Sequence, residues 1–382
     1  MIEWQRQPSR RDRGERGPGA TLGPSCLNRS HTHVQPAAVP EQTGGLVAIT
    51  TIVLTLFGWA SIPLFLRHFA EVGIDAWTSN GWRYGFSALL WAPMLWIGAR
   101  NGTLTRELWR AALLPSVFNV LGQIAFALAP FYVQPGVMTF SLRLQIVFVT
   151  VGAAVLFASE RRVIRTPLFL AGLLLVTLGT AGTIALKEGG LGEATGLGVS
   201  LSIGSGLLYA SYALAVRYSM RGVNPLLAFA VISQLTAAAL LPLMVIWGKD
   251  SGAALLEQPS RELFLVLISS VIGIGLGHTF YYFSIARLGV AVSAGVIQLQ
   301  PVLVAIVSMR LFDEVFTGPQ WASGFVAVLG AGAILLAQHR ATRKRDPIGG
   351  FSELPVDADA AAAVADRMNS REDMPRANEP AR

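Results

Sequence analysis

The chain contains ten stretches of about twenty predominantly apolar residues, and this feature restricts its fold more than any other. The hydrocarbon core of a bilayer is roughly 30 Å thick, so an α-helix needs about 20 apolar residues to cross it. We therefore expect an all-α polytopic membrane protein with ten transmembrane helices. The expected spans are 46–66, 78–98, 110–129, 136–158, 167–186, 196–216, 225–247, 263–284, 290–311 and 319–338.

The composition excludes an ordinary soluble domain. Hydrophobic residues make up 52% of the chain and charged residues 14%, whereas a soluble domain carries about 25% charged residues. Three expected spans begin at a proline, which is favourable at the first helical position because its missing N–H would have no partner there. These residues are Pro167, Pro225 and Pro319. Other prolines, at Pro63, Pro115, Pro242 and Pro301, fall within spans and predict kinks.

The two ends of the chain are polar and charged. Residues 1–45 are rich in Arg and predict a disordered basic tail, and residues 339–382 predict a disordered cytoplasmic tail that begins with HRATRKR. A basic segment beside a membrane span indicates orientation and contact with anionic lipid. We therefore expect membrane lipid as a partner and no nucleic acid. The single cysteine, Cys26, excludes a disulfide framework and a cysteine-based metal site.

The distribution of Lys and Arg between the short loops predicts the orientation, because cytoplasmic loops carry the excess. With the N-terminus inside, the inner loops carry Arg100, Arg106, Arg110, Arg161, Arg162, Arg165, Arg217, Arg221 and Arg287. The outer loops carry Arg67, Lys187, Lys249 and Arg261. We expect both termini to be cytoplasmic and the protein to lie in the cell membrane, a bacterial inner membrane or an equivalent plasma membrane.

The sequence also contains an internal repeat. When the chain is shifted by 155 positions, seven of the 29 residues from 121 to 149 are identical to their counterparts. The halves of the repeat, 46–186 and 196–338, each contain five expected spans. Since five is odd, the second half enters the membrane from the opposite side. An inverted repeat of this kind allows a carrier to open alternately to either face, with its site near the midplane.

Several segments together resemble EamA-type carriers of the drug/metabolite transporter superfamily. They are WASIP from Trp59, WRYGFSALL from Trp82, the LQ-containing fourth span followed by SERR, GLLYASYALAVRY, and YYFSIARLGVAVSAGVIQLQPVLVAI followed by an acidic DE. The resemblance covers nearly all of 46–338. It implies a central cavity lined by the first four helices of each half, with the fifth helix peripheral, and export or exchange of amino acids, metabolites or other small solutes. One departure is LQIVF in the first copy, where fourth helices of the family often keep a proline, as at Pro301.

Charged side chains inside the spans are costly and therefore indicate a pathway or an internal partner. No Asp or Glu lies deep in an expected span, so the usual carboxylate proton relay is missing. Arg143 and His278 lie within spans, and Arg83 lies near the outer end of the second span. In the repeat register Gln298 is the counterpart of Arg143, and Gln123 is the counterpart of His278.

Arg143 has two interpretations. A cavity position would give it a permanent positive charge for a carboxylate or phosphate of the solute. Alternatively, its side chain extends to the outer headgroups or hydrogen-bonds carbonyls at a kinked neighbour. His278 is either a neutral imidazole packed in the bundle or, if transport is proton-coupled, the titrating group.

The remaining candidates are polar or amphipathic side chains of the spans and acids at their ends. The candidates for the cavity are Arg143, Gln145, Gln298, Gln300, Gln123, His278, Tyr209 and Tyr282. The glutamines could equally be interhelical hydrogen-bond partners, and the tyrosines could face lipid or pack. Glu160 and Glu314 lie at helix ends, where we expect them to cap a helix, pair with Arg or close a gate.

The motifs of soluble catalysis are missing. The run GIGIGLGH follows no strand, and Gly273 with Gly277 has the spacing of close helix packing. There is no Walker A, HExxH or GxSxG sequence, so we expect neither an enzyme nor a cofactor or metal. The sequence predicts a secondary transporter for a small polar or amphipathic solute, anionic or amino-acid-like, working by efflux or exchange. An intramembrane enzyme and a lipid-translocating or accessory protein are the alternatives, and a homodimer stays open.

Overall fold

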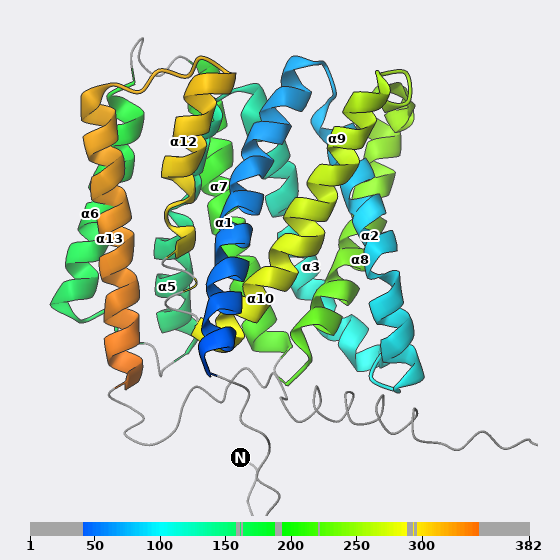
Figure 1. The fold of residues 1–382 in the computed structure, drawn as a ribbon, viewed down its shortest axis with the longest axis horizontal. Helices are drawn as coiled ribbons and strands as arrows, with labels where there is room; N and C mark the ends of the chain where they lie inside the picture. Colours follow the sequence, from blue (N-terminus) through cyan, green and yellow to red (C-terminus); the bar gives the residue numbers. More distant parts are fainter. Residues whose placement is uncertain are drawn as a thin grey trace, which may run out of the picture. The chain divides into compact units, whose positions relative to one another are not determined.

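The computed structural model describes residues 41–157, 161, 163–187, 193–220, 222–288, 293 and 296–343, and in these ranges every regular element is a helix (Figure 1). The first half contains α1 (Glu41–Glu71), α2 (Ala76–Arg100), α3 (Arg106–Leu128), η1 (Ala129–Phe131), α4 (Pro135–Leu142), α5 (Gln145–Leu156) and α6 (Pro167–Ala185). The second half contains α7 (Glu193–Ser219), α8 (Pro225–Trp247), η3 (Lys249–Leu255), α9 (Ser260–Ser270), η4 (Val271–Leu276), α10 (Gly277–Leu288), α12 (Gln300–Leu311) and α13 (Gly318–Arg343).

Eight helical runs in the described part of the chain are long and apolar enough to cross a membrane. They match eight of the ten expected spans. The expected span at 78–98 coincides with α2, which does not reach that hydropathy because its first turns carry Asn80, Arg83 and Tyr84. The expected span at 290–311 coincides in part with α12, which has 12 described residues.

The expected boundaries differ from the structure in two ways. Helix α1 begins at Glu41 and α13 continues to Arg343, so both extend into segments expected to be tails. The rest of the two tails lies outside the described residues. The span expected at 136–158 is interrupted between α4 and α5, and the span expected at 263–284 contains the π-helical turn η4.

Side-chain caps explain where several helices begin. Asp75 Oδ1 accepts a hydrogen bond from the backbone N–H of Thr78 at 2.8 Å, at the start of α2. Thr166 and Asn224 cap α6 and α8 in the same manner, each followed by a proline at the first helical position. A cap side chain replaces a partner that the first-turn N–H groups lack, so the starts expected at Pro167 and Pro225 are confirmed.

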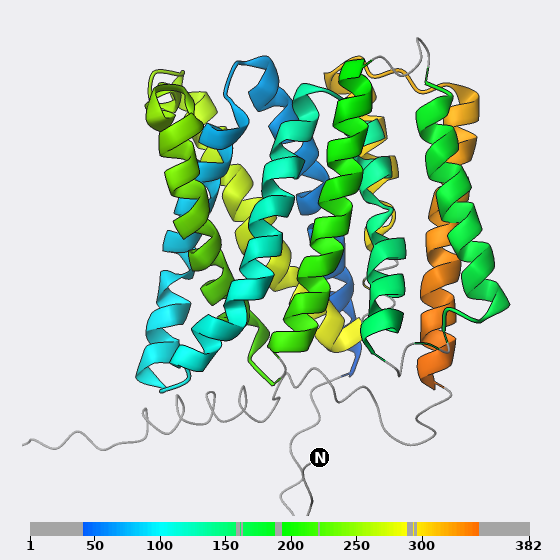
Figure 2. The ribbon, with the colours of Figure 1, turned by 180° about the vertical axis from the view of Figure 1, so that it is seen from behind.

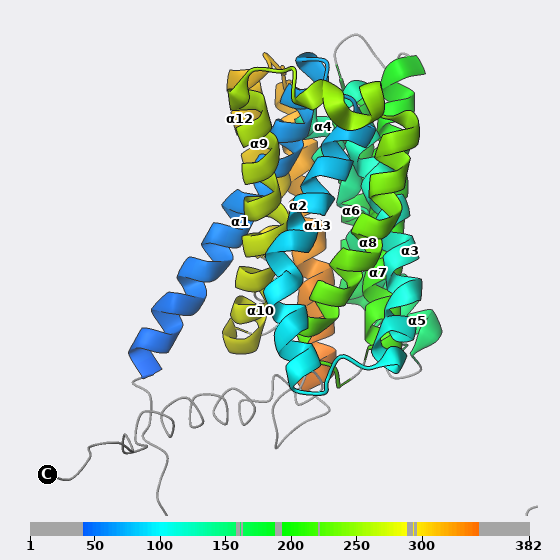
Figure 3. The same ribbon diagram turned by 90° about the vertical axis from the view of Figure 1, so that its right-hand side faces the viewer.

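Most helices pack against a helix from the other half of the chain. The pairs are α1 with α10, α2 with α8, α3 with α7, α4 with α12, and α6 with α13. Figure 2 shows α3 beside α7, and Figure 3 shows the continuous run of α9, η4 and α10 beside α2. The two halves are therefore interleaved rather than separate bundles.

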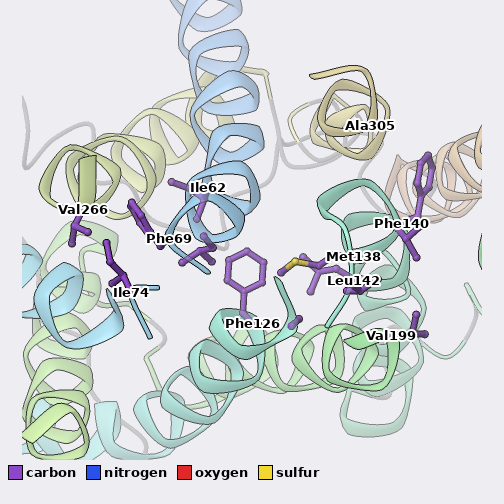
Figure 4. Packing of buried hydrophobic residues seen from close by; sticks show 14 of the residues in the cluster. Ile62, Phe69, Ile74, Phe126, Met138, Phe140, Leu142, Val199, Val266 and Ala305 are labelled. Atoms are coloured by element: carbon purple, nitrogen blue, oxygen red, sulfur yellow. The ribbon is translucent and has the colours of Figure 1, made fainter. Parts of the chain in front are cut away.

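The largest buried cluster lies where helices of both halves meet. Phe126 of α3 points between Ile62 and Phe69 of α1 on one side and Met138 of α4 on the other (Figure 4). Val266 of α9 and Ala305 of α12 bring the second half into the same cluster. Burial of such side chains contributes roughly 25 cal/mol per Å² where water is the alternative, but between helices in lipid the close packing itself is the stabilising term.

Glycines allow α6 and α13 to approach closely, on the left of Figure 1. A Cβ at Gly330 would lie 2.5 Å from the backbone nitrogen of Val176 and 2.8 Å from the carbonyl oxygen of Gly172. A Cβ at Gly179 would lie 2.4 Å from the backbone nitrogen of Ala327. Because these neighbours are backbone atoms, they cannot rotate away, and any side chain must separate the helices.

Gly330→Leu should therefore lower the stability of the fold by about 1–3 kcal/mol, the usual cost of overpacking. Gly332→Leu is the matched control, since Gly332 lies on the same helix, is exposed, and would place a Cβ where no atom of a neighbouring residue lies within 4 Å. Thermal unfolding of both variants in detergent measures the difference. Equal melting temperatures for the two would contradict the packing described.

Candidate functional site

The helices at the fourth expected span of each half, 136–158 and 290–311, are interrupted at positions 155 residues apart. Helix α4 ends at Leu142 and α5 begins at Gln145, while α12 begins at Gln300, which is 155 positions further on. The residues before the two starts, Leu144 and Leu299, have ψ of −14° and −11°, against about −42° in an α-helix. The first interruption occurs although no proline follows it. There α7 is close, and a Cβ at Gly206 would lie 2.8 Å from the carbonyl oxygen of Leu142.

A hydrogen-bond chain connects the two interruptions. Arg143 donates from Nη2 to Oε1 of Gln300, and Gln300 donates from Nε2 to the backbone carbonyl of Trp59 at 2.9 Å. The Trp59 carbonyl is available to Gln300 because its usual partner within α1 is missing: Pro63, four residues later, has no N–H to donate to it. Arg143 also lies at the C-terminus of α4, where a positive charge is favourable.

Trp59 also connects α1 to the π-helical turn. Its indole Nε1 donates to the carbonyl of Gly273 at 3.1 Å. Its ring lies 5.4 Å from the ring of His278 and 4.9 Å from that of Tyr281, measured between centroids. Tyr281 in turn lies within electrostatic range of Arg143. We call Trp59, Arg143, His278, Tyr281 and Gln300 the central cluster.

His278 is enclosed by aromatic rings. Its imidazole stacks on Phe229 with centroids 4.1 Å apart and an interplanar angle of 19°, and Tyr282 lies 6.5 Å away. Nδ1 lies 3.1 Å from the carbonyl oxygen of Ile274. Among the described residues no ion pair involves His278. These surroundings agree with the first of the two interpretations of His278, a neutral imidazole packed in the helix bundle. The second interpretation, a group that titrates during proton-coupled transport, stays a prediction.

The other expected residues are distributed over the surrounding helices. Gln298 and Arg143 line one small pocket together with Phe140 and Pro301. Gln145 is the first residue of α5, and a Cβ at Gly206 of α7 would lie 3.4 Å from its backbone nitrogen. The backbone carbonyl of Gln123 accepts from Nδ2 of Asn80 at 3.0 Å.

Tyr209 packs edge-on against Phe126, with ring centroids 6.0 Å apart. Its ring approaches α3 over Gly122, where a Cβ would lie 2.8 Å from Tyr209 Cε1. Tyr209 also lies within electrostatic range of Arg83. The expected cavity residues therefore separate into a group around Arg143 and a group on α3 and α7.

Glu314 connects the halves outside the spans. Its carboxylate accepts from the backbone N–H of Gly136 at 2.8 Å and from that of Val137 at 3.1 Å, in the first turn of α4. The side chain is only 6% exposed, and this burial raises the pKa of Glu314 while the two N–H groups oppose the shift. Glu314 thus caps a helix of the first half. Glu160, expected in the equivalent role, lies outside the described residues.

Arg83 is the one charged residue of this region that sequence reasoning did not select as a site. It is 2% exposed, and its Nε and Nη1 have no hydrogen-bond partner among the described residues. Asn80, one turn earlier on α2, has a buried Oδ1 that also lacks a partner in this part of the chain. The signal that could have found them is the polar start of an otherwise apolar span. No cluster of three or more metal-ligating residues occurs among the described residues.

Replacing Gln300 by Leu should destabilise the fold by about 1–3 kcal/mol, because Arg143 and the Trp59 carbonyl would each lose a partner while staying enclosed. The double variant Arg143→Met/Gln300→Leu should be less destabilised than the sum of its single variants. Unfolding in detergent measures the stability of the two single variants and the double variant. Gln145→Leu is the control at the equivalent position, where we expect the free energy of unfolding to change by no more than about 0.5 kcal/mol. Strict additivity would mean that Arg143 and Gln300 do not interact.

Comparison with known proteins adds a family and a fold. The family model described as "EamA-like transporter family", a part of the drug/metabolite transporter superfamily, matches residues 196–336. No curated protein matches the chain. One solved structure, described only as "Crystal structure of protein", aligns with a TM-score of 0.53 at 16% identity, over 78% of this chain and 99% of that one. At this identity the likeness shows the fold alone.

Proposed function

Residues 196–336 belong to the EamA-like transporter family, and on that premise we propose that the chain is a secondary carrier that moves a small solute by alternating access. The family match and the apolar helices make it a multi-pass membrane protein of a transporter family. Our proposal adds the architecture, the direction and the class of solute. It comprises ten spans in two inverted halves, 46–186 and 196–338, and efflux or exchange of a polar or amphipathic metabolite.

The observation that carries the proposal is the equivalence of the two interrupted helices. Discontinuous helices near the midplane form the solute site in many carriers built from inverted repeats. Here the interruptions lie 155 residues apart, the same shift as the sequence repeat, and Arg143 of one bonds Gln300 of the other. If one half rocks against the other, a solute bound at the contact between the halves would be exposed to each face of the membrane in turn.

The helix packing supports the same symmetry. Exchanging each helix with its counterpart converts the contact of α1 with α10 into that of α7 with α3, and both contacts occur. The contact of α2 with α9 likewise becomes that of α8 with α3, which is also present. The contact of α5 with α7 becomes that of α12 with α1, and the pairs α2 with α8 and α6 with α13 convert into themselves. A pseudo-two-fold relation between the halves accounts for this pattern.

Specific roles follow for the expected residues. We propose that Arg143, Gln298 and Gln300 line the solute path at the interruptions, with Gln145, Gln123, Tyr209, Tyr282 and His278 around them. The cap formed by Glu314 would hold the outer end of α4 against the second half, as a gate that must open on that side. His278 is the candidate for proton coupling, and Glu160 for the equivalent inner contact.

The proposed location is the cell membrane with both termini in the cytoplasm, which follows from the arginine-rich loops expected inside. One chain contains both halves of the proposed path, so a homodimer would be two complete carriers. Size-exclusion chromatography with light scattering in detergent distinguishes a monomer from a homodimer.

Counterflow in proteoliposomes tests the function. The purified chain should equilibrate at least one solute from a panel of amino acids, sugars and organic acids faster than protein-free liposomes do. Arg143→Gln should slow that transport strongly while the variant remains folded, and His278→Gln should remove any response to a pH gradient. If folded protein equilibrates nothing in the panel, the carrier proposal fails; normal kinetics in the Arg143 variant would remove that residue from the path.

A further inference from the structure

The guanidinium of Arg83 is buried inside the helix bundle, and no described acid forms an ion pair with it. The side chain is 2% exposed and lies seven residues after the start of α2, about 10 Å along the helix axis. Two of its nitrogens have no hydrogen-bond partner among the described residues, and no ion pair of the described chain includes it. Burying a charge without a partner is strongly unfavourable, so the fold maintains an arrangement that a bound anion would relieve.

Nearby acids do not supply that anion. Every acidic residue that the structure describes lies at a helix end or in a loop, as Asp75, Glu262 and Glu314 do. Arg143 differs from Arg83 in this respect, since Gln300 accepts from its Nη2. Arg83 is therefore the arginine with the greater capacity for an added acceptor.

The guanidinium of Arg83 faces the second half of the chain. Its Nη2 faces Gly273 in the π-helical turn, and a Cβ built on that glycine would lie 3.8 Å from it. Ser270 Oγ donates to the Arg83 carbonyl at 2.6 Å, which fixes α9 against α2 at this level. π-helical turns within α-helices are frequent at functional sites. A third buried atom without a partner among the described residues, Asn80 Oδ1, is on the same helix one turn away.

The ligand chemistry follows from the charges and the neighbours. A single guanidinium neutralises one negative charge, so a monocarboxylate gives a neutral site, whereas a phosphate dianion would leave one charge uncompensated. An amino acid would also bring an ammonium group, and the described acids, which could neutralise it, lie only at helix ends or in loops. Ile62 packs at Gly273 next to the guanidinium, and Tyr84 and Tyr209 lie within electrostatic range of it, so the surroundings are apolar and aromatic. These suit an apolar body attached to the carboxylate.

We infer that Arg83 is the binding site for the carboxylate of the transported solute, and that the solute is a monocarboxylate with an apolar or aromatic body. The inference rests on the proposed carrier function, whose solute class it narrows. A planar carboxylate can accept two parallel hydrogen bonds from one guanidinium. The Nε and Nη1 donors of Arg83 that lack partners are the donors available to it.

Ligand-induced thermal stabilisation of the full chain in detergent tests the inference with three matched probes at constant ionic strength. 3-Phenylpropionate should raise the melting temperature by several degrees. Its amide, which lacks the charge, should give no shift, and phenylalanine, which adds an ammonium group, should give a smaller one. Inorganic phosphate serves as the dianion. A shift from phosphate or phenylalanine as large as that from 3-phenylpropionate would overturn the assignment of a monocarboxylate, as would no shift from 3-phenylpropionate.

Two variants test the residue. Arg83→Met removes the charge and should melt higher than the wild type without ligand, because an unpaired buried charge is gone. It should also bind 3-phenylpropionate roughly tenfold to hundredfold more weakly. Arg83→Lys keeps the charge and should keep part of the shift, and Arg310→Met on exposed α12 surface should keep all of it. An Arg83→Met variant that unfolds, or that responds to the probe like the wild type, would show that Arg83 is structural.

Failure of the inference and failure of the carrier function are distinguishable. If Arg83→Met transports a neutral or zwitterionic solute as fast as the wild type, the carrier stands and the site at Arg83 falls. If the probe binds in an Arg83-dependent way but no solute of the counterflow panel is moved, the site stands and the carrier falls.

Discussion

The hydrogen-bond chain from Arg143 through Gln300 to the Trp59 carbonyl joins both interrupted helices to α1, and the interior of the protein is arranged around it. Each link has a local cause. Pro63 leaves the Trp59 carbonyl without a partner, the interruption of α4 leaves Arg143 at a helix C-terminus, and Gln300 begins α12. Because the donors and acceptors come from different halves, relative movement of the halves must remake this chain.

Away from their ends, the described helices bury positive charge and aromatic rings but no acids. Arg143 donates one hydrogen bond to an amide, His278 stacks on Phe229, and Arg83 has two nitrogens without a partner among the described residues. In a medium of low dielectric constant an unpaired cation is more favourable beside an anion than beside another cation, and this is the physical basis of the proposed anionic solute. The polar start of α2 lowers the hydropathy of this helix, and it is also the part of the helix that contains Asn80 and Arg83, the residues with unpartnered polar atoms.

Much of the fold could be predicted from the sequence, because helix length and apolarity are local properties. The repeat register also aligned Gln145 with Gln300, and both begin a helix after an interruption. The partner of Arg143 could not be predicted. The register suggested Gln298 as its counterpart, whereas the hydrogen bond goes to Gln300, since the contact depends on how the two interrupted helices cross. Arg83 was placed near a span end, and its burial depends on the packing of α9 and η4 against α2.

The inverted repeat is the central claim, and the accessibility of two equivalent loops tests it most directly. The α2–α3 loop and the α8–α9 loop are counterparts, so inversion requires them to lie on opposite faces of the membrane. In a Cys26→Ser background, a cysteine at exposed Thr103 or at exposed Ala253 can be labelled in intact cells with a membrane-impermeant thiol reagent. The account predicts labelling of Ala253→Cys alone until the membrane is opened. Labelling of both positions, or of neither, in intact cells would contradict it.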